Sequence, residues 1–223
     1  MVGGIKLKKL ICPSMMCADF SCLEKEVKTL NRAGTDIFHV DIMDGTFVPN
    51  FGMGLQDLQL IRKATDKLVD VHLMIQNPGQ YVEMFADIGA DIIYFHPEAD
   101  LHAMRTLDKI KNKGKKAGIA INPGTSVASI SELLPFIDYL MVMTVNPGFA
   151  GQKYIYSVDQ KIEQLVELQK DYHYEIVVDG AISRERISTL SKKGVSGFVL
   201  GTSALFGKEQ TYEEIISEIK GEN

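Results

Sequence analysis

The sequence predicts an α/β fold of the (β/α)8 TIM-barrel type, and three observations support that prediction. Eight short apolar runs rich in β-branched residues alternate with eight helical patterns, which is the order of a parallel sheet built from βα units. Several runs are apolar throughout, as expected for strands covered on both faces. The 223 residues lie near the ~250 that such a barrel takes, and no linker or low-complexity segment divides them. We therefore expect a single barrel domain over residues 1–223, with residues 1–9 a loose leader.

Turn and capping residues mark the limits of the first four βα units. Asp19 precedes a helical pattern and is the expected N-cap, and Asp44-Gly45 is a turn signal that ends the second strand. Asn77-Pro78 starts the third helix and Gly89 ends it. We expect strands at residues 10–13, 37–43, 68–74 and 91–96, and helices at residues 19–33, 56–64, 78–88 and 101–112.

The last four units are closed by glycine and proline turns. Asn122-Pro123-Gly124 follows the fifth strand, and a glycine-rich segment at residues 146–151 follows the sixth. We expect strands at residues 117–121, 139–145, 174–179 and 197–200, and helices at residues 127–134, 157–170, 183–192 and 211–220. An open doubly wound sheet uses the same units, but its commonest mark, G-x-G-x-x-G in the first βα turn, is absent.

Composition excludes several classes of partner. A formal net charge of −5, with no basic run beyond residues 113–116, argues against nucleic acid. No apolar stretch approaches the roughly 20 residues that span a bilayer, and the N-terminus lacks the apolar core of a signal peptide. Cys12, Cys17 and Cys22 are odd in number and match no zinc spacing, so we expect reduced thiols. These features predict a cytoplasmic protein that binds neither nucleic acid nor a membrane.

Metal-ligand residue types recur at the carboxyl ends of three strands, where a barrel places its active site. Side chains alternate along a strand, so His39 and Asp41 share one face. His72 ends the third strand in the same way, and Asp179 ends the seventh. A lone His-x-Asp pair is more simply a buried hydrogen bond, but three such strand ends favour a metal site. Nitrogen and oxygen donors without thiolate suit Zn²⁺, Mn²⁺, Co²⁺ or Fe²⁺ and do not rank them.

Glycines after the sixth, seventh and eighth strands predict a phosphate site. Residues 148–151, Gly180-Ala181 and Gly201-Thr202 can expose backbone N–H groups beside helix N-termini, although glycine is also the default residue of tight turns. Three methionines near strand ends predict a water-poor wall beside the metal, although a single methionine would be core filler. These are Met43, Met74 and Met143; the other polar residues at strand ends are Ser14, His96, Asn122 and Asn146, while His102 and His173 are expected in solvent.

These motifs together resemble the ribulose-phosphate 3-epimerase family. The resemblance covers residues 11–206 and is carried by Cys12-Pro13-Ser14, residues 39–45 with Phe47-Val48-Pro49-Asn50, residues 70–74, residues 145–149 and Val178-Asp179-Gly180. It implies a barrel of the ribulose-phosphate-binding type and a metal-dependent epimerase acting at C3 of a phosphorylated 2-ketose. The implied reaction converts D-ribulose 5-phosphate to D-xylulose 5-phosphate, D-allulose 6-phosphate to D-fructose 6-phosphate, or both.

The resemblance also implies roles for individual residues. One divalent ion, with Zn²⁺ preferred over Mn²⁺, Co²⁺ and Fe²⁺, would be held by His39, Asp41, His72 and Asp179. Asp41 and Asp179 would be the acid/base pair, and a homodimer is expected. With the methionines, the expected substrate contacts are Ser14, Met43, His72, Met74, Met143, Gly148, Phe149, Ala150, Gly151, Asp179, Gly180, Ala181, Gly201 and Thr202.

Physical chemistry agrees with this reaction. A proton next to a carbonyl is weakly acidic, and a divalent ion on the substrate oxygens would stabilise the enediolate by several kcal/mol. Inversion then needs proton donors on both faces of the planar intermediate. Asp41 on the second strand and Asp179 on the seventh would face each other across the barrel mouth and fill those two roles.

Departures from the family pattern leave the sugar length open. Thr46 stands where the family often has histidine, Ala150 and Ala181 where glycine is usual, and Thr202 where serine is usual. Residues 96–98, 149–152 and 201–206 are closer to the allulose-6-phosphate branch. If Thr46 faces the pocket, its small side chain would make room for a longer sugar.

Two other functions compete with epimerisation. A sugar-phosphate or nucleotide decarboxylase on the same barrel would carry an Asp-x-Lys-x-x-Asp array, but Asp41-Ile42-Met43-Asp44 offers no lysine. A non-catalytic sugar-phosphate-binding protein would be expected to lack an acid or base, and both Asp41 and Asp179 are present.

Overall fold

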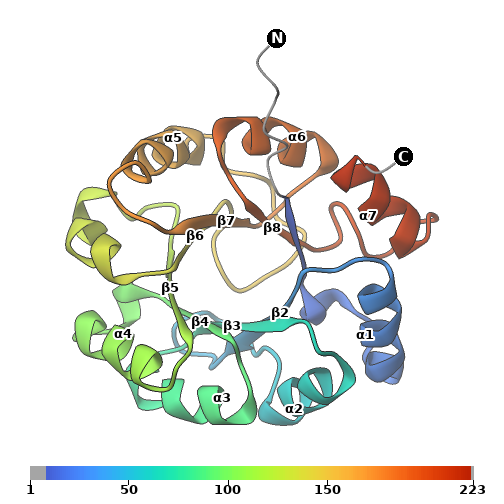
Figure 1. Ribbon diagram of the computed structural model, residues 1–223, viewed down its shortest axis with the longest axis horizontal. Helices are drawn as coiled ribbons and strands as arrows, with labels where there is room; N and C mark the ends of the chain where they lie inside the picture. The colour runs from blue at the N-terminus through green and yellow to red at the C-terminus, as the bar shows by residue number, and fades with distance from the viewer. Residues whose placement is uncertain (1–8, 222–223) are drawn as a thin grey trace.

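Eight parallel strands form one sheet that curls into a barrel, with the helices outside it (Figure 1). The computed structural model describes residues 9–221, and within them the predicted TIM barrel is confirmed. The strand order is β1-β8-β7-β6-β5-β4-β3-β2, and a parallel bridge between Ser14 and His39 brings the ends of β1 and β2 together. The strands are β1 Leu10–Pro13, β2 Ile37–Met43, β3 Leu68–Met74, β4 Ile92–Phe95, β5 Lys116–Ile121, β6 Tyr139–Met143, β7 Glu175–Asp179 and β8 Gly197–Leu200.

Within residues 9–221, six α-helices connect one strand to a later one and a seventh follows β8, supplemented by 3-10 helices. The α-helices are α1 Leu23–Arg32, α2 Leu55–Ala64, α3 Val82–Ile88, α4 Ala103–Asn112, α5 Val158–Leu168, α6 Arg184–Lys193 and α7 Tyr212–Lys220. The 3-10 helices are η1 Met15–Cys17, η2 Phe20–Cys22, η3 Pro78–Gln80, η4 Pro97–Ala99 and η5 Ala128–Phe136.

The short helix expected at residues 127–134 is present as the 3-10 helix η5 between β5 and β6. Pro135 lies inside it and cannot donate a helical hydrogen bond. The hydroxyls of Ser129 and Ser131 donate to the carbonyls of Ser126 and Ala128, which gives the backbone an alternative to α-helical bonding.

Two expected helices are also divided. Asp19 was expected to cap a helix over residues 19–33, but its carboxylate accepts from the backbone N–H of Ser21 and caps η2. The α-helix α1 begins only after that turn. The expected helix over residues 78–88 is divided at Tyr81, which ends η3 and precedes α3, while Asn77 before η3 adopts a left-handed conformation.

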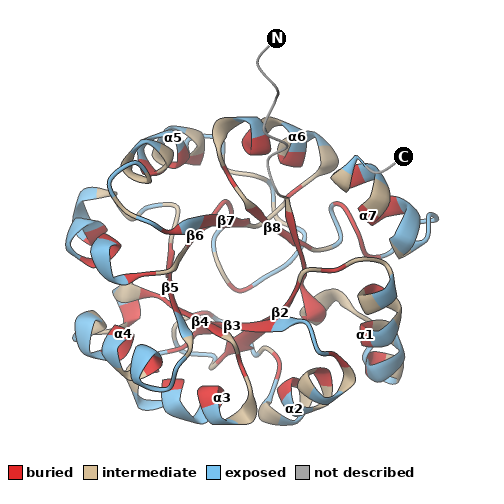
Figure 2. Ribbon diagram, viewed as in Figure 1, coloured by how far each residue is buried: buried red, intermediate tan, exposed pale blue. Residues whose placement is uncertain are grey.

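The strands separate two apolar layers. Figure 2 shows the strands buried over most of their length, with exposed residues at the start of β3, β5 and β7, and the helices buried mainly on their inner faces. Side chains that point outward from the strands pack under the helices, and those that point inward fill the barrel. Tyr94 on β4 lies inside the barrel beside Gly118 of β5. A Cβ on Gly118 would lie 2.5 Å from the ring of Tyr94. Glycine at that position therefore makes room for the tyrosine.

Three aspartates join neighbouring strands at the amino end of the barrel, opposite the mouth. We call Asp36, Asp91 and Asp138 the bracket aspartates, because each directly precedes an even-numbered strand and pairs reciprocally with the preceding odd one. Each carboxylate accepts from a backbone N–H at 2.9 Å, and each backbone N–H donates to the carbonyl of the same residue; the partners are Ile11, Val69 and Ala117. Edge backbone groups of β1, β3 and β5 are thereby satisfied.

Two further expectations concern the rest of the chain. Of the expected leader, residues 1–8 lie outside the described residues, and the ammonium of Lys9 donates to the carbonyl of Ile219 at 2.6 Å. All three cysteines are free thiols, as predicted. Among residues 9–221, none of the helices combines the length and apolar character that crossing a membrane requires.

Candidate active site

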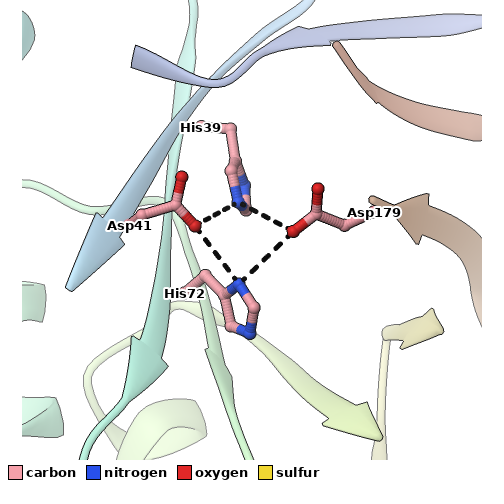
Figure 3. A group of neighbouring side chains, drawn as sticks. All are labelled: His39, Asp41, His72 and Asp179. Atoms are coloured by element: carbon pink, nitrogen blue, oxygen red, sulfur yellow. Dashed lines mark hydrogen bonds and ion pairs between the residues drawn. The ribbon is translucent and has the colours of Figure 1, made fainter. Parts of the chain in front are cut away.

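The four predicted metal ligands meet at the mouth of the barrel (Figure 3). His39 and Asp41 come from β2, His72 from β3 and Asp179 from β7. Strand alternation turns all four inward, and the β2–β3 register places Asp41 directly opposite His72. One donor atom from each residue lies within 4.8 Å of the other three. Strands distant in the sequence thus converge on one point.

The donor atoms lie near one another, at distances close to or somewhat longer than those around one small ion. Nε2 of His39 lies 3.2 Å from Oδ1 of Asp41 and 4.0 Å from Oδ2 of Asp179. Nδ1 of His72 lies 3.5 Å and 3.8 Å from the same two oxygens. Four donors at about 2.0–2.1 Å from one ion in a tetrahedron are about 3.3 Å apart.

A buried nitrogen of His72 without a hydrogen-bond partner also indicates a metal site. Nδ1 of His72 is buried and has no hydrogen-bond partner, a state that costs roughly 1–3 kcal/mol. It faces the carboxylates of Asp41 and Asp179. Two imidazoles and two carboxylates form a hard and borderline donor set. The cluster could therefore hold a divalent ion, and no distance selects among Zn²⁺, Mn²⁺, Co²⁺ and Fe²⁺.

An outer carboxylate orients His39. Nδ1 of His39 lies 2.5 Å from Oδ1 of Asp70, its direct neighbour in the β2–β3 register. Burial lowers the pKa of His39, but the charges of Asp70 and Asp41 outweigh it and raise the pKa well above its ordinary value. Without an ion, His39 is therefore protonated at neutral pH.

The two proposed acid/base carboxylates are perturbed in opposite directions. Burial raises the pKa of Asp41, but the neighbouring His39 and His72 outweigh it and hold the pKa far below its usual range. The hydroxyl of Ser14 donates to its Oδ2 at 2.8 Å. Burial, followed by the charge of Asp41, raises the pKa of Asp179 to about 7. In the absence of an ion, Asp41 is ionised while Asp179 holds a proton near neutral pH.

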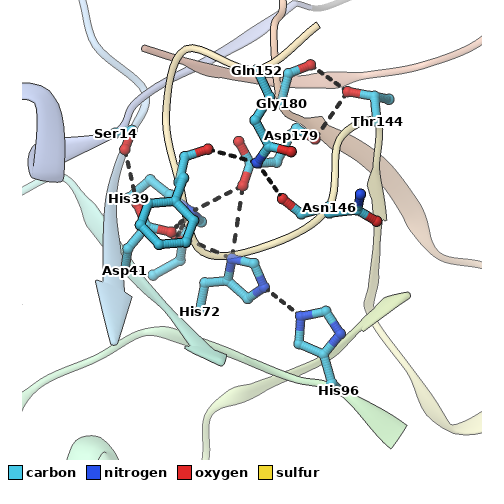
Figure 4. Close-up of polar contacts among 12 residues, drawn as sticks. Ser14, His39, Asp41, His72, His96, Thr144, Asn146, Gln152, Asp179 and Gly180 are labelled. Carbon is cyan, nitrogen blue, oxygen red and sulfur yellow. Dashed lines mark hydrogen bonds and ion pairs between the residues drawn. The ribbon is translucent and has the colours of Figure 1, made fainter. Parts of the chain in front are cut away.

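Asp70, His96 and Glu98 belong to the site although no role in it was predicted for them. Nε2 of His96 lies 2.8 Å from Nε2 of His72 (Figure 4). Burial lowers the pKa of His96 to about 4, so the ring is neutral. Asp70 precedes His72 by two residues on the same strand face, and Glu98 follows His96 by two. These acid-x-His and His-x-acid spacings in the sequence could have predicted that Asp70, His96 and Glu98 belong to the site.

The expected substrate contacts surround one hollow above the ligand cluster. All of them except His72, which is buried, line it: Ser14, Met43, Met74, Met143, Gly148, Phe149, Ala150, Gly151, Asp179, Gly180, Ala181, Gly201 and Thr202. Met16, Cys17, Asn146 and Gln152 also line it and were not expected. Their contact with a substrate stays a prediction, but the hollow is where the three glycine turns and the metal ligands meet.

The loop after β6 closes over this hollow and is drawn in yellow across the barrel mouth in Figure 1. The side-chain amide of Asn50 donates to the carbonyl of Gly148 at 2.6 Å, which links the loop after β2 to the loop after β6. The amide of Gln152 donates to the carbonyls of Asn146 and Phe149 at 2.6 and 2.9 Å. The loop is thus held at its middle and folded on itself.

The turn after β7 adopts a left-handed conformation at two successive residues. Gly180 has φ 115° and Ala181 has φ 52°, an angle that costs a residue with a Cβ about 1–2 kcal/mol. The hydroxyl of Thr144 on the neighbouring β6 loop donates to the carbonyls of Asp179 and Gly180 (Figure 4). Such strain persists only where the surroundings hold it, which is typical of ligand sites.

Other polar residues lie away from the cluster. Thr46 is exposed and is absent from the residues that line the hollow, and its backbone N–H donates to the carboxylate of Asp44. It therefore makes no room for a longer sugar. His102 and His173 are exposed, as expected.

Comparison with known proteins places the chain among sugar-phosphate epimerases. Residues 10–206 match the model of the ribulose-phosphate 3 epimerase family. The chain is 41% identical over 216 residues to the ribulose-phosphate 3-epimerase of Bacillus subtilis, covering 95% of this chain and 98% of that protein. It is 40% identical over 201 residues to the ribulose-phosphate 3-epimerase of Aquifex aeolicus, covering 89% and 90%.

Solved structures at low identity share the fold. KGPDC from Streptococcus mutans matches with TM-score 0.75 at 12% identity over 96% of each chain. The 3-keto-L-gulonate-6-phosphate decarboxylase of Vibrio cholerae matches with TM-score 0.71 at 13% identity, over 96% of this chain and 98% of that one. At these identities the likeness shows the fold alone.

Proposed function

The chain belongs to the ribulose-phosphate 3-epimerase family and is an isomerase acting on carbohydrate phosphates, and from this premise we propose a metal-dependent two-base mechanism. The observation that supports it is the pair of carboxylates in the ligand cluster. Asp41 and Asp179 reach the cluster from opposite sides of the barrel mouth, with opposite pKa shifts (Figure 3). An inversion needs such a pair, because one group removes a proton from one face and the other returns a proton to the opposite face.

In this mechanism each residue of the site has a separate role. Asp41, ionised and oriented by the hydroxyl of Ser14, removes the C3 proton of one epimer. Asp179 delivers a proton to the other face, and the roles reverse for the other epimer. A divalent ion held by His39, Asp41, His72 and Asp179 would supply Lewis acidity, worth several kcal/mol, to the substrate oxygens. Buried Met43, Met74 and Met143 keep water from the reacting carbon.

Backbone groups would hold the phosphate. The turns at Gly180-Ala181 and Gly201-Thr202 border the hollow beyond the ligand cluster, and α6 begins directly after the first of them. A helix N-terminus favours an anion through its unpaired N–H groups and its dipole. We propose that these two turns bind the phosphate and that the loop after β6 covers the sugar.

We propose that both the pentulose and the hexulose phosphate are substrates, and that turnover of the hexulose is at least comparable to that of the pentulose. The relatives named above are ribulose-phosphate 3-epimerases, which supports D-ribulose 5-phosphate. The resemblance of residues 96–98, 149–152 and 201–206 to the allulose-6-phosphate branch of the family supports D-allulose 6-phosphate. A difference of one methylene-sized group is worth only ~1–3 kcal/mol, so cross-activity is expected.

One experiment tests the reaction, the metal and the sugar together. The purified protein is incubated with each sugar phosphate, before and after chelation, and kcat/KM for epimer formation is measured. We expect turnover of both sugars, loss of activity on chelation and loss of most bound metal in His72→Ala. Full activity of a metal-free preparation would overturn metal dependence. A kcat/KM for the hexulose more than about a thousandfold below that for the pentulose would overturn dual specificity.

The decarboxylase alternative has no support at the site. The structural neighbour named as a decarboxylase shares only the fold, at 13% identity. The lysine of an Asp-x-Lys-x-x-Asp array after Asp41 would fall on Met43, whose side chain packs with Met74 and Val48 instead. No second function is therefore proposed.

A further inference from the structure

Two side chains outside the ligand set form a chain of contacts that ends on His72. Nε2 of His96 lies 2.8 Å from Nε2 of His72, and Nδ1 of His96, which has no hydrogen-bond partner, faces Oε2 of Glu98 at an ion-pair distance of 3.5 Å. Both histidines are fully buried, so solvent does not compete for these nitrogens. The ring of Phe47 packs on His96 with centroids 4.8 Å apart and holds the imidazole in place. The order Glu98, His96, His72 leads from the rim of the barrel to the ligand cluster.

The direction of hydrogen bonding along this chain decides whether His72 can bind a metal. A ligating nitrogen must present its lone pair, so Nδ1 of a neutral His72 is available only if the proton is on Nε2. That N–H donates to Nε2 of His96, whose own proton must then be on Nδ1, facing Glu98. We propose that Glu98, acting through His96, fixes the tautomer of His72 that leaves Nδ1 free for the divalent ion. This inference rests on the metal site of the proposed function.

Glu98 is fixed in the orientation that this role needs. Its Oε1 accepts from the backbone N–H of Asn122 at 2.9 Å and from the hydroxyl of Thr125. With Oε1 occupied by two donors, Oε2 is the oxygen that faces His96. Both carboxylate oxygens can only accept when ionised, so the proton of His96 is drawn to Nδ1.

A glutamine in place of Glu98 would reverse the direction of hydrogen bonding between His96 and His72 without changing the size of the side chain at position 98. The two donors at Asn122 and Thr125 require an oxygen between them, so the amide oxygen of the new side chain would take that place. Its NH₂ group would then face Nδ1 of His96 and make that nitrogen an acceptor. The His96 proton would move to Nε2, and the proton of His72 would move to Nδ1, the nitrogen that the ion needs.

The test is Glu98→Gln, with Glu132→Gln as the matched control, because Glu132 is exposed on η5 and takes no part in the contacts among Glu98, His96 and His72. Affinity for Zn²⁺ and Co²⁺ is measured by competition with a chelator in wild type and both variants. Histidine ¹⁵N spectra of the metal-free proteins report the tautomer of His72 and His96. We expect wild type and the control to show His72 protonated on Nε2. In Glu98→Gln we expect protonation on Nδ1 and about 10–100-fold weaker binding of both metals.

The outcomes separate this inference from the proposed function. Wild type that binds metal and epimerises sugar phosphate, together with a Glu98→Gln variant of unchanged tautomer and unchanged affinity, overturns the inference alone. Wild type that binds neither metal overturns the proposed metal site and the inference with it. Equal losses in Glu98→Gln and Glu132→Gln also overturn the inference, because the effect would not pass through His96.

Discussion

Asp41 and Asp179 are the same chemical group in different surroundings. Asp41 lies between two imidazoles and accepts from the hydroxyl of Ser14, whereas Asp179 lies beside the charge of Asp41 and has few donors of its own. The surroundings of Asp41 stabilise the ionised carboxylate, and those of Asp179 favour the protonated carboxylic acid. A pair of aspartates on one barrel can therefore act as base and acid in the same turnover.

Replacing one carboxylate should separate the two halves of the reaction. Asp179→Asn should reduce epimerisation by at least about 10²–10⁴-fold, because a positioned acid or base is lost and metal binding is weakened. It should still exchange the C3 proton of one epimer with heavy water, through Asp41. Mass spectrometry of each sugar phosphate after incubation measures this. Exchange from both epimers at equal rates would contradict the two-base scheme.

Metal affinity should depend on pH through the same groups. In the metal-free protein the pKa of Asp179 is raised to about 7 and that of His39 is raised well above 6.5, so both hold protons below neutral pH. An ion that binds Nε2 of His39 must displace the proton on that nitrogen, whereas Asp179 can bind through one oxygen and keep on the other the proton that it delivers in turnover. Each displaced proton weakens binding about tenfold per pH unit below its pKa, so affinity should fall by about one decade per unit as pH drops below neutral. Calorimetry in buffers of different ionisation enthalpy counts the released protons, and a pH-independent affinity would contradict the assignment.

The inward orientation of the four proposed ligands could be predicted from the sequence because strand alternation decides which side chains face inward. Asp70 and His96 carry the same alternation, but their roles depend on which strand lies beside them. Asp70 contacts His39 only through the β2–β3 register, and His96 reaches His72 only because β4 is next to β3. Periodicity within one strand contains no information about that lateral pairing.

Loops and turns at the carboxyl ends of the strands shape the pocket. The turn at Gly180 and Ala181 is held by Thr144, and the loop after β6 is held by Asn50. Both contacts join different βα units, so neighbouring elements fix one another. The sequence shows the glycines of these loops but not their partners, since Asn50 and Gly148 are 98 residues apart.

The turn after β7 should not tolerate a side chain at Gly180. A Cβ there would lie 2.5 Å from Cγ2 and 2.9 Å from the backbone nitrogen of Val145, at a φ of 115°. Gly180→Ala should lower the free energy of unfolding by about 2–4 kcal/mol and raise KM for the sugar phosphate. Gly207→Ala is the control, because φ is 68° and no atom lies within 4 Å of its Cβ. Its cost should be limited to about 1–2 kcal/mol of backbone strain, without a change in KM. Equal effects of both substitutions on KM would contradict the role of the turn.

The whole barrel has a catalytic end and a structural end. The mouth carries buried charged groups, whereas the opposite end is held by the bracket aspartates, which repeat at every second strand. The last even strand, β8, is preceded by Ser196, whose hydroxyl and N–H both donate to the carbonyl of Ile176. Stability and chemistry are therefore assigned to different ends, as is usual for this fold.

Removal of the side chain of one bracket aspartate should lower the stability of the fold and leave catalysis unchanged. Asp138→Ala deprives the buried N–H of Ala117 of its acceptor, which should lower the free energy of unfolding by about 1–3 kcal/mol. Urea denaturation measures the change, and kcat/KM should match wild type. Asp108→Ala on the exposed face of α4 is the control and should change neither. A loss of kcat/KM in Asp138→Ala without loss of stability would contradict the division between the two ends.

The position of the four donors has a consequence for how long the folded protein resists proteolysis. β2 and β3 are neighbours in the sequence and supply three donors, while β7 brings the fourth from the far side of the barrel. With the proposed ion bound, a partly folded chain without β7 offers an incomplete set, so binding favours the finished barrel. A free ion at a hundred times its Kd adds about 2.7 kcal/mol to that preference. Scarcity of the metal would then shorten the lifetime of the protein as well as stop its turnover, because a barrel without its ion opens more often to proteases.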